Sequence, residues 1–228
     1  MVKGLIWFRS DLRIDDNPAL LEAAHSCDEL IGIYIFSQKQ WNLHHESNVK
    51  QDFLIQNLIT LEKQLMKLHI PLIVLQTDTF EVLPKDLQKF IDIHQIKSCH
   101  WNNEFGVNEN KRDDAVEILL RTNSIHISRH HDQVIYEPGF LRTGQDKPFS
   151  VFTPFKRRWI ENCSMSFLDL DKADKPLKKT SLTSDLSALK LEKSHQVNMD
   201  AWPAGEADAF ARLQKFLEHK INNYSESR

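Results

Sequence analysis

Three polar segments each follow an apolar run, and their side chains could form a ligand site. They are residues 9–13 (RSDLR), 40–44 (QWNLH) and 101–113 (WNNEFGVNENKRD). In open α/β sheets, ligands bind outside the carboxyl ends of the strands, where the connecting loops converge. We therefore expect a ligand site at the sheet edge where these segments meet.

One carboxylate in the third segment is the strongest candidate for a ligand contact. Glu109 has two acceptor oxygens, which could pair with two neighbouring N–H donors on one edge of a ligand. A structural role is also open. Asn108 is a good helix N-cap, and a glutamate in a first turn interacts favourably with the helix dipole.

The other two segments also allow two interpretations. Arg9, Asp11 and Arg13 alternate in charge and could form an internal salt-bridge cluster that fixes the loop. We favour this structural and domain-contact role. His44 is an isolated histidine in a polar loop, where histidines are most often only solvated.

We predict no metal site. The run His130-His131-Asp132 offers three potential metal ligands, but consecutive side chains of an extended segment point to opposite faces. We therefore expect a loop or domain-contact role for this run. The three cysteines are widely spaced and contain no C-x-x-C pair, which argues against zinc and against a disulfide framework. We expect reduced, mainly buried thiols.

Composition limits the classes of partner. With 41% hydrophobic and 27% charged residues, the 228-residue chain is typical of a globular protein. It has no apolar run of membrane-spanning length and no apolar leader, so we predict a cytoplasmic protein that does not bind membranes. The net charge of −3 gives no overall attraction to nucleic acid, so we expect no DNA binding by this chain alone. Walker, G-x-G-x-x-G and nucleophile-elbow motifs are absent.

Alternating apolar runs and helical patterns predict an α/β fold: a doubly wound, five-stranded parallel sheet of Rossmann-like type. We expect strands near residues 4–8, 30–36, 72–75, 98–101 and 125–128. We expect helices near residues 18–24, 49–68, 83–94, 109–121 and 153–159, and a last one after Pro203. Asn17, Asn48 and Thr153 are the expected caps of the first, second and fifth of these helices.

We predict three regions. Residues 1–131 form the α/β domain, and residues 132–200 form a connector with a short helix and a linker, which runs along the surface or is partly disordered. Residues 201–228 contain the first helix of an α-helical domain.

The motifs together resemble those of the DNA photolyase/cryptochrome family. The segment Trp7-Phe8-Arg9-x-Asp11-Leu12-Arg13 is similar to the family's opening, and residues 101–109, 151–159 and the final Tyr224-x-x-x-Arg228 are similar to later motifs. The chain resembles most the N-terminal part of a folate-type class I cyclobutane pyrimidine dimer photolyase.

The resemblance implies an antenna module. In folate-binding members, residues that match His44, Asn108 and Glu109 bind 5,10-methenyltetrahydrofolate, and this favours folate over a deazaflavin here. We expect the binding to be weak, because a lysine of the helical domain helps to close the pocket. Tyr224 matches a residue that contacts the phosphate region of FAD, but most of the FAD site would lie beyond residue 228.

The complete family protein is a deoxyribodipyrimidine photo-lyase, a carbon–carbon lyase that repairs UV-damaged DNA in light. By resemblance, this chain would carry only the antenna-chromophore part, and its own enzyme activity is open because the FAD-binding helical domain, its expected partner, is missing. Alternatives are a stand-alone ligand-binding or interaction module and a fragment of a signalling cryptochrome.

Overall fold

The computed structural model describes residues 1–163, 173, 175–189 and 202–227. A five-stranded parallel sheet forms its centre, with the strand order β3-β2-β1-β4-β5. The strands are β1 (Lys3–Phe8), β2 (Glu29–Phe36), β3 (Leu72–Gln76), β4 (Ser98–Asn102) and β5 (His126–His130). The predicted doubly wound sheet is thus confirmed. Successive strands are added on one side of β1 up to β3 and on its other side from β4 onward.

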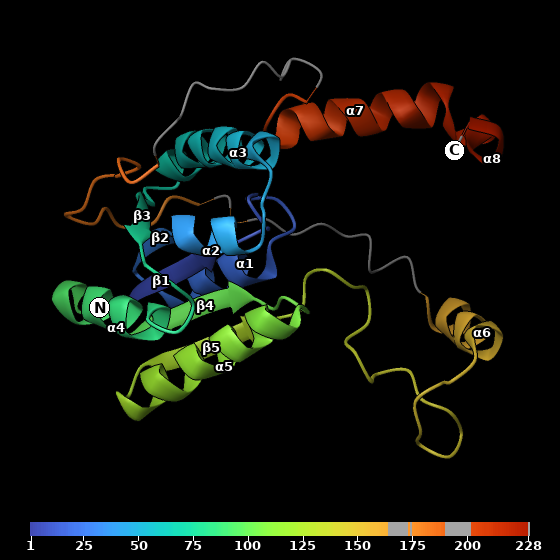
Figure 1. Cartoon of the computed structure of the whole chain (residues 1–228), viewed down its shortest axis with the longest axis horizontal. Helices are drawn as coiled ribbons and strands as arrows, with labels where there is room; N and C mark the ends of the chain where they lie inside the picture. The colour runs from blue at the N-terminus through green and yellow to red at the C-terminus, as the bar shows by residue number, and fades with distance from the viewer. Residues whose placement is uncertain (164–172, 174, 190–201, 228) are drawn as a thin grey trace.

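Helices cover both faces of the sheet (Figure 1). Helices α1 (Pro18–Ser26) and α3 (Asn48–Lys67) pack on one face, where Ile6 and Phe8 of β1 enter the core. Helices α4 (Leu83–His94) and α5 (Val107–Thr122) pack on the other face, where Leu5 and Trp7 point. This alternation explains why the strands are apolar almost throughout: both of their faces are buried.

The helix starts differ from several predictions. A short helix α2 (Gln38–Leu43) occupies a segment predicted as a loop; the Ser37 hydroxyl accepts a hydrogen bond from the Gln40 amide at 3.1 Å and caps it. A six-residue helix is too short to show a hydrophobic period. Helix α3 is capped by the Ser47 side chain and not by Asn48.

The predicted starts of two further helices were also wrong. Helix α5 begins at Val107 after Gly106, so Asn108 lies inside its first turn. Helix α6 (Phe152–Asn162) begins before Thr153, without a side-chain cap. The predicted cap Asn17 is confirmed, since its side chain accepts a hydrogen bond from the Leu20 amide at 3.1 Å.

Part of the predicted linker runs along the edge of the sheet. The Val74 amide donates to the Asp185 carbonyl at 2.8 Å, and the Asp185 amide donates to the Leu72 carbonyl at 2.9 Å. These bonds extend the outer edge of β3, and they agree with a linker that runs along the surface of the α/β domain. The rest of that linker, residues 164–172, 174 and 190–199, lies outside the described residues.

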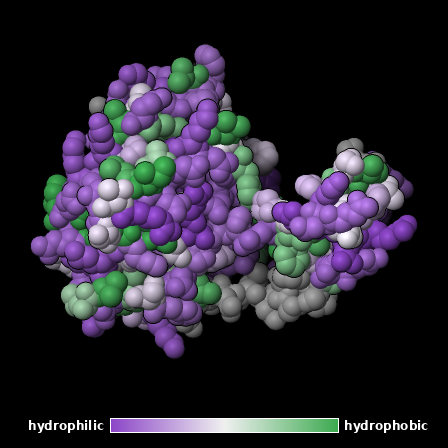
Figure 2. Space-filling view, turned by 90° about the horizontal axis from the view of Figure 1, so that it is seen from below, coloured by the Kyte–Doolittle hydropathy of each residue, from purple (hydrophilic) through white to green (hydrophobic). Residues whose placement is uncertain are grey.

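Helices α6 and α7 (Glu206–His219) extend away from the sheet, and neither has a buried residue. Figure 2 shows a smaller lobe beside the main body, on the side where Figure 1 places α6 and the far end of α7. A 3₁₀ turn (Ile221–Asn223) and the short helix α8 (Tyr224–Ser227) end the described chain. None of the described helices has the length and hydropathy to cross a membrane.

A buried polar group lies between α1 and the sheet. His100 of β4 is 1% exposed, and its Nε2 atom lies 3.2 Å from the Ser98 hydroxyl and 3.8 Å from the Cys27 sulfur. Burial, together with the nearby His130 and His126, lowers the pKa of His100 to about 4. Cys27 and Cys99 are buried as predicted, whereas Cys163 is exposed.

We predict that His100 makes the fold sensitive to acid. Between about pH 6.5 and 4 the unfolded chain binds a proton that the folded His100 does not, so stability falls as the pH falls. The full effect below pH 4 is on the order of 3 kcal/mol. Urea unfolding from pH 7.5 to 4.5 should show a shallower decline for His100→Gln than for wild type, while the exposed His25→Gln should follow wild type. Parallel curves for His100→Gln and wild type would contradict this.

Candidate functional site

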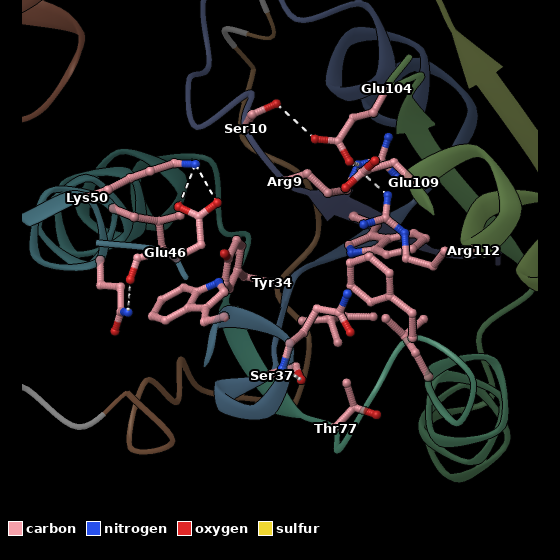
Figure 3. Close-up of a pocket in the computed structure, with 18 residues that line it drawn as sticks. Arg9, Ser10, Tyr34, Ser37, Glu46, Lys50, Thr77, Glu104, Glu109 and Arg112 are labelled. Atoms are coloured by element: carbon pink, nitrogen blue, oxygen red, sulfur yellow. Dashed lines mark hydrogen bonds and ion pairs between the residues drawn. The ribbon is translucent and has the colours of Figure 1, made fainter. Parts of the chain in front are cut away.

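A cavity of about 190 Å³ opens at the carboxyl ends of β1, β2 and β3 and beside the first turn of α5. Its walls come from the loops after β1, β2, β3 and β4 and from α2, α3, α4 and α5 (Figure 3). Eighteen side chains line it, namely Trp7, Arg9, Ser10, Tyr34, Ile35, Ser37, Gln40, Trp41, Glu46, Lys50, Gln51, Leu54, Thr77, Phe80, Leu83, Glu104, Glu109 and Arg112.

Aromatic side chains form much of the wall. Trp7, the residue before the last of the central strand β1, is 1% exposed. Trp41 of α2 packs edge-on against Phe36, with ring centroids 4.8 Å apart. Tyr34 is also buried, and burial raises the pKa of its phenol, so it is a neutral hydroxyl at physiological pH. Such walls suit a flat, conjugated ligand.

Two arginines lie on the face of the Trp7 ring. The guanidinium carbons of Arg9 and Arg112 are 4.7 and 4.8 Å from its centroid, within the range of a cation–π contact. Arg112 Nη2 donates to Glu104 at 2.8 Å and to Asp113 at 2.7 Å. Arg9 forms a looser ion pair with Asp113, with Nη1 and Oδ2 3.5 Å apart.

In this charge cluster, ion pairing outweighs the effect of burial on the pKa values of Glu104 and Arg112. Burial alone would raise the pKa of Glu104, but Arg9 and Arg112 outweigh it and hold that pKa below its usual value. For Arg112, burial lowers the pKa, and the carboxylates of Asp113 and Glu104 raise it by more. The Ser10 hydroxyl also donates to Glu104 at 3.0 Å.

A second network holds the loop that carries Arg9 and Ser10. One oxygen of Asp11 accepts from the Arg9 amide at 2.8 Å, and the other accepts from the Asn102 side chain at 2.6 Å. Arg13 donates to the carboxylate of Asp132, beyond β5. The loop and domain-contact interpretation of these residues therefore agrees with the geometry, except that Arg9 also lines the cavity.

Of the predicted ligand residues, Glu109 alone lines the cavity directly. Its carboxylate lies over Gly106, where an added Cβ would be 1.9 Å from Oε2, so this approach needs a glycine. Figure 3 shows Glu109 beside Glu104 and Arg112, across the cavity from Lys50 and Glu46.

The other predicted residues lie elsewhere. Asn108 is exposed in the same turn as Glu109. His44 is exposed at the end of α2, and its Nε2 atom is 2.7 Å from the side-chain nitrogen of Gln40, which does line the cavity. Tyr224 lies in α8, against Phe216, at the far end of α7 (Figure 1). Arg228 lies outside the described residues.

Sequence reasoning missed part of the wall. Tyr34 lies inside a predicted strand, and its place two residues before the strand's end was the available signal. Phe80 follows β3 in a loop to which no role was given.

The His130-His131-Asp132 run has protein partners. Asp132 pairs with Arg13, the ring of His131 stacks on Phe105, and His130 contacts the Ser128 hydroxyl at 2.9 Å. Within residues 1–163, 173, 175–189 and 202–227, no group of His, Cys, Asp and Glu side chains has a metal-binding arrangement.

We predict that Arg112→Leu destabilises the fold by about 3–5 kcal/mol, because it leaves the fully buried Asp113 without its closest cation. Adding Asp113→Leu should recover a large part of this loss. Lys111→Leu, an exposed neighbour, is the control and should change stability by less than about 1 kcal/mol. Urea unfolding compares wild type, Arg112→Leu, Asp113→Leu, the double variant and Lys111→Leu, and losses that add in the double variant would contradict the coupling.

Comparisons with known proteins agree on one family. The sequence matches the DNA photolyase family over residues 4–178. The deoxyribodipyrimidine photo-lyase of Buchnera aphidicola (subsp. Acyrthosiphon pisum) is 31% identical over 98% of this chain and 47% of its own length. That of Escherichia coli K12 is 28% identical over 100% of this chain and 48% of its own length.

Solved structures share the fold. The cryptochrome of Synechocystis sp. PCC6803 superposes with a TM-score of 0.78 at 24% identity, over 100% of this chain and 49% of that chain. The chain thus spans about half the length of these relatives. Since the family match covers most of the sequence and the sheet has the fold of solved members, the chain belongs to the DNA photolyase family.

Proposed function

We propose that this chain is the antenna-chromophore part of a deoxyribodipyrimidine photo-lyase, and that its cavity binds 5,10-methenyltetrahydrofolate. The observation that carries the proposal is the carboxylate of Glu109, which lines an aromatic cavity at the carboxyl edge of the sheet. A carboxylate in this position can accept two hydrogen bonds from the N–H edge of a pterin.

The surrounding residues suit such a ligand. Trp41, Tyr34 and Phe80 offer flat apolar surfaces for a conjugated ring. His44 would orient the side chain of Gln40, which lines the cavity. His44 would therefore act through Gln40 and would not contact the ligand. Asn108 would contribute at the rim of the cavity. When bound, the folate supplies absorption of near-ultraviolet or blue light and transfer of the excitation energy.

We do not expect this chain to bind flavin. Tyr224 is 55% exposed and does not line the cavity that contains Glu109, so we propose no FAD site among the described residues. Light-driven repair of UV-damaged DNA would belong to a protein that also holds FAD. We propose no repair activity and no DNA binding for these 228 residues by themselves.

Two other functions compete with this proposal. A stand-alone module would bind a different small molecule or a protein partner with the same cavity. A cryptochrome fragment is compatible with the fold, because one structural relative is a cryptochrome. Folate titration separates the first rival from our proposal.

We predict that Glu109→Gln weakens folate binding by about tenfold or more, because it removes the charge and one matched acceptor. Gly106→Ala should also weaken binding, since the new methyl group displaces the Glu109 carboxylate without changing its charge. Asp114→Asn, an exposed carboxylate one turn further along α5, is the matched control. Fluorescence titration with 5,10-methenyltetrahydrofolate measures each affinity. Equal affinities for wild type and Glu109→Gln would remove Glu109 from the site, and tighter binding of FAD than of folate would favour another ligand.

We also predict that the chain purifies without flavin and does not split pyrimidine dimers in light. Absorption spectra near 450 nm and a dimer-repair assay with added FAD test this. Stoichiometric FAD in the purified chain, or light-dependent repair, would contradict the assignment to the antenna part alone.

A further inference from the structure

The first turn of α7 contacts the loop after β1 through one side chain. Glu206 Oε2 accepts a hydrogen bond from the Ile14 amide at 2.9 Å, and Oε1 accepts one from the Asp15 amide at 3.0 Å. Ile14 and Glu206 are 192 positions apart in the sequence. The contact therefore joins two distant parts of the chain.

The two amides form a small receptor for an anion. Adjacent main-chain N–H groups that point the same way bind carboxylates and phosphates. Arg13 holds the loop in this shape, because its guanidinium donates to the carbonyls of Asp15 and Asp16 and also binds Asp132. Glu206 places one oxygen on each amide, so both hydrogen bonds are charge-assisted.

The residue before Glu206 is fixed by another helix. The Gly205 amide donates to Asn57 Oδ1 of α3 at 2.9 Å. Gly205 has a φ of +105°, and an added Cβ would lie 2.6 Å from Thr60 Cγ2, so both conformation and space require glycine. The start of α7 is thus held on one side by α3 and on the other by the loop after β1.

We propose that the Ile14 and Asp15 amides are a carboxylate receptor, and that Glu206 bound in it sets the direction in which α7 leaves the α/β domain. Helix α7 has no buried residue, and it extends away from the sheet beyond this point (Figure 1). The contact at its first turn therefore determines where the following residues lie. Arg9 and Ser10 of the same loop line the cavity, so the position of α7 is also fixed relative to the cavity.

Hydrogen exchange of the two amides tests the receptor directly. In Glu206→Ala, the Ile14 and Asp15 amides should exchange about tenfold faster or more, because both charge-assisted bonds are lost. Glu206→Gln keeps one acceptor oxygen and should deprotect one amide more than the other. Asp208→Ala removes an exposed carboxylate from the same helical turn and should leave both amides unchanged. Unchanged exchange in Glu206→Ala, or equal acceleration in Asp208→Ala, overturns the proposal.

Spin labels test the direction of α7. The labelled chain carries Lys63→Cys on α3, Lys215→Cys on α7 and Cys163→Ser, since Cys163 is the exposed cysteine. Pulsed distance measurements should give a narrow distribution with Glu206 and a clearly broader one with Glu206→Ala, while Asp208→Ala stays narrow. An equally narrow distribution in Glu206→Ala overturns the proposal. Neither test depends on folate, so a failure here is independent of the proposed antenna function.

Discussion

The carboxylate of Asp11 joins three elements beside β1 and β4, the neighbouring strands between which the order of strand addition changes. It binds the Arg9 amide of the loop after β1 and the side chain of Asn102, the last residue of β4. Asn102 in turn accepts from the Ala19 amide in the first turn of α1 and donates to Asn17, the cap of that helix. Each buried polar group in this network finds a partner, which is the condition under which burial of such groups is tolerated. With the loop fixed in this way, Arg9 faces the cavity and the amides of Ile14 and Asp15 face α7.

The charged side of the cavity is balanced by its own counter-ions. Arg112 and Arg9 would be costly to bury alone, and so would Asp113, which is fully buried. Both arginines form ion pairs with Asp113, and both lie over the Trp7 ring. Because the charges are already paired, the site offers little net attraction for a free anion. Recognition would depend instead on shape and on directed hydrogen bonds, as Glu109 provides.

Sequence patterns predicted the framework better than the site. Strands of a sheet covered on both faces are apolar runs, and Gly4 to Phe8 or Leu30 to Phe36 have few rival interpretations. The first strand and its charged loop also identify the edge where the cavity forms. Helix α2 has no such signal, because it is only six residues long; a hydroxyl cap and a ring contact with Phe36 help to hold it. The sequence did not predict where α5 begins, because the helix starts after Gly106 without a side-chain cap. Asn108, the expected cap, therefore lies inside the first turn beside Glu109. The ligand role of Glu109 stays a prediction, since only its position is described.

The pairing of Asp185 with β3 has a consequence for how this protein behaves at high concentration. An open sheet has two outer strands, and a free outer strand can recruit a strand from another molecule. On the β3 side, the backbone of Asp185 already occupies those hydrogen-bonding groups in part. On the β5 side, the strand is short and carries His126, Arg129 and His130, and Arg129 is held by Asp114 and Glu117. Charged residues on a short strand discourage the addition of a further strand. Addition of a further strand is thus disfavoured on both sides of the sheet, by the covering backbone of Asp185 on one side and by Arg129 on a short strand on the other.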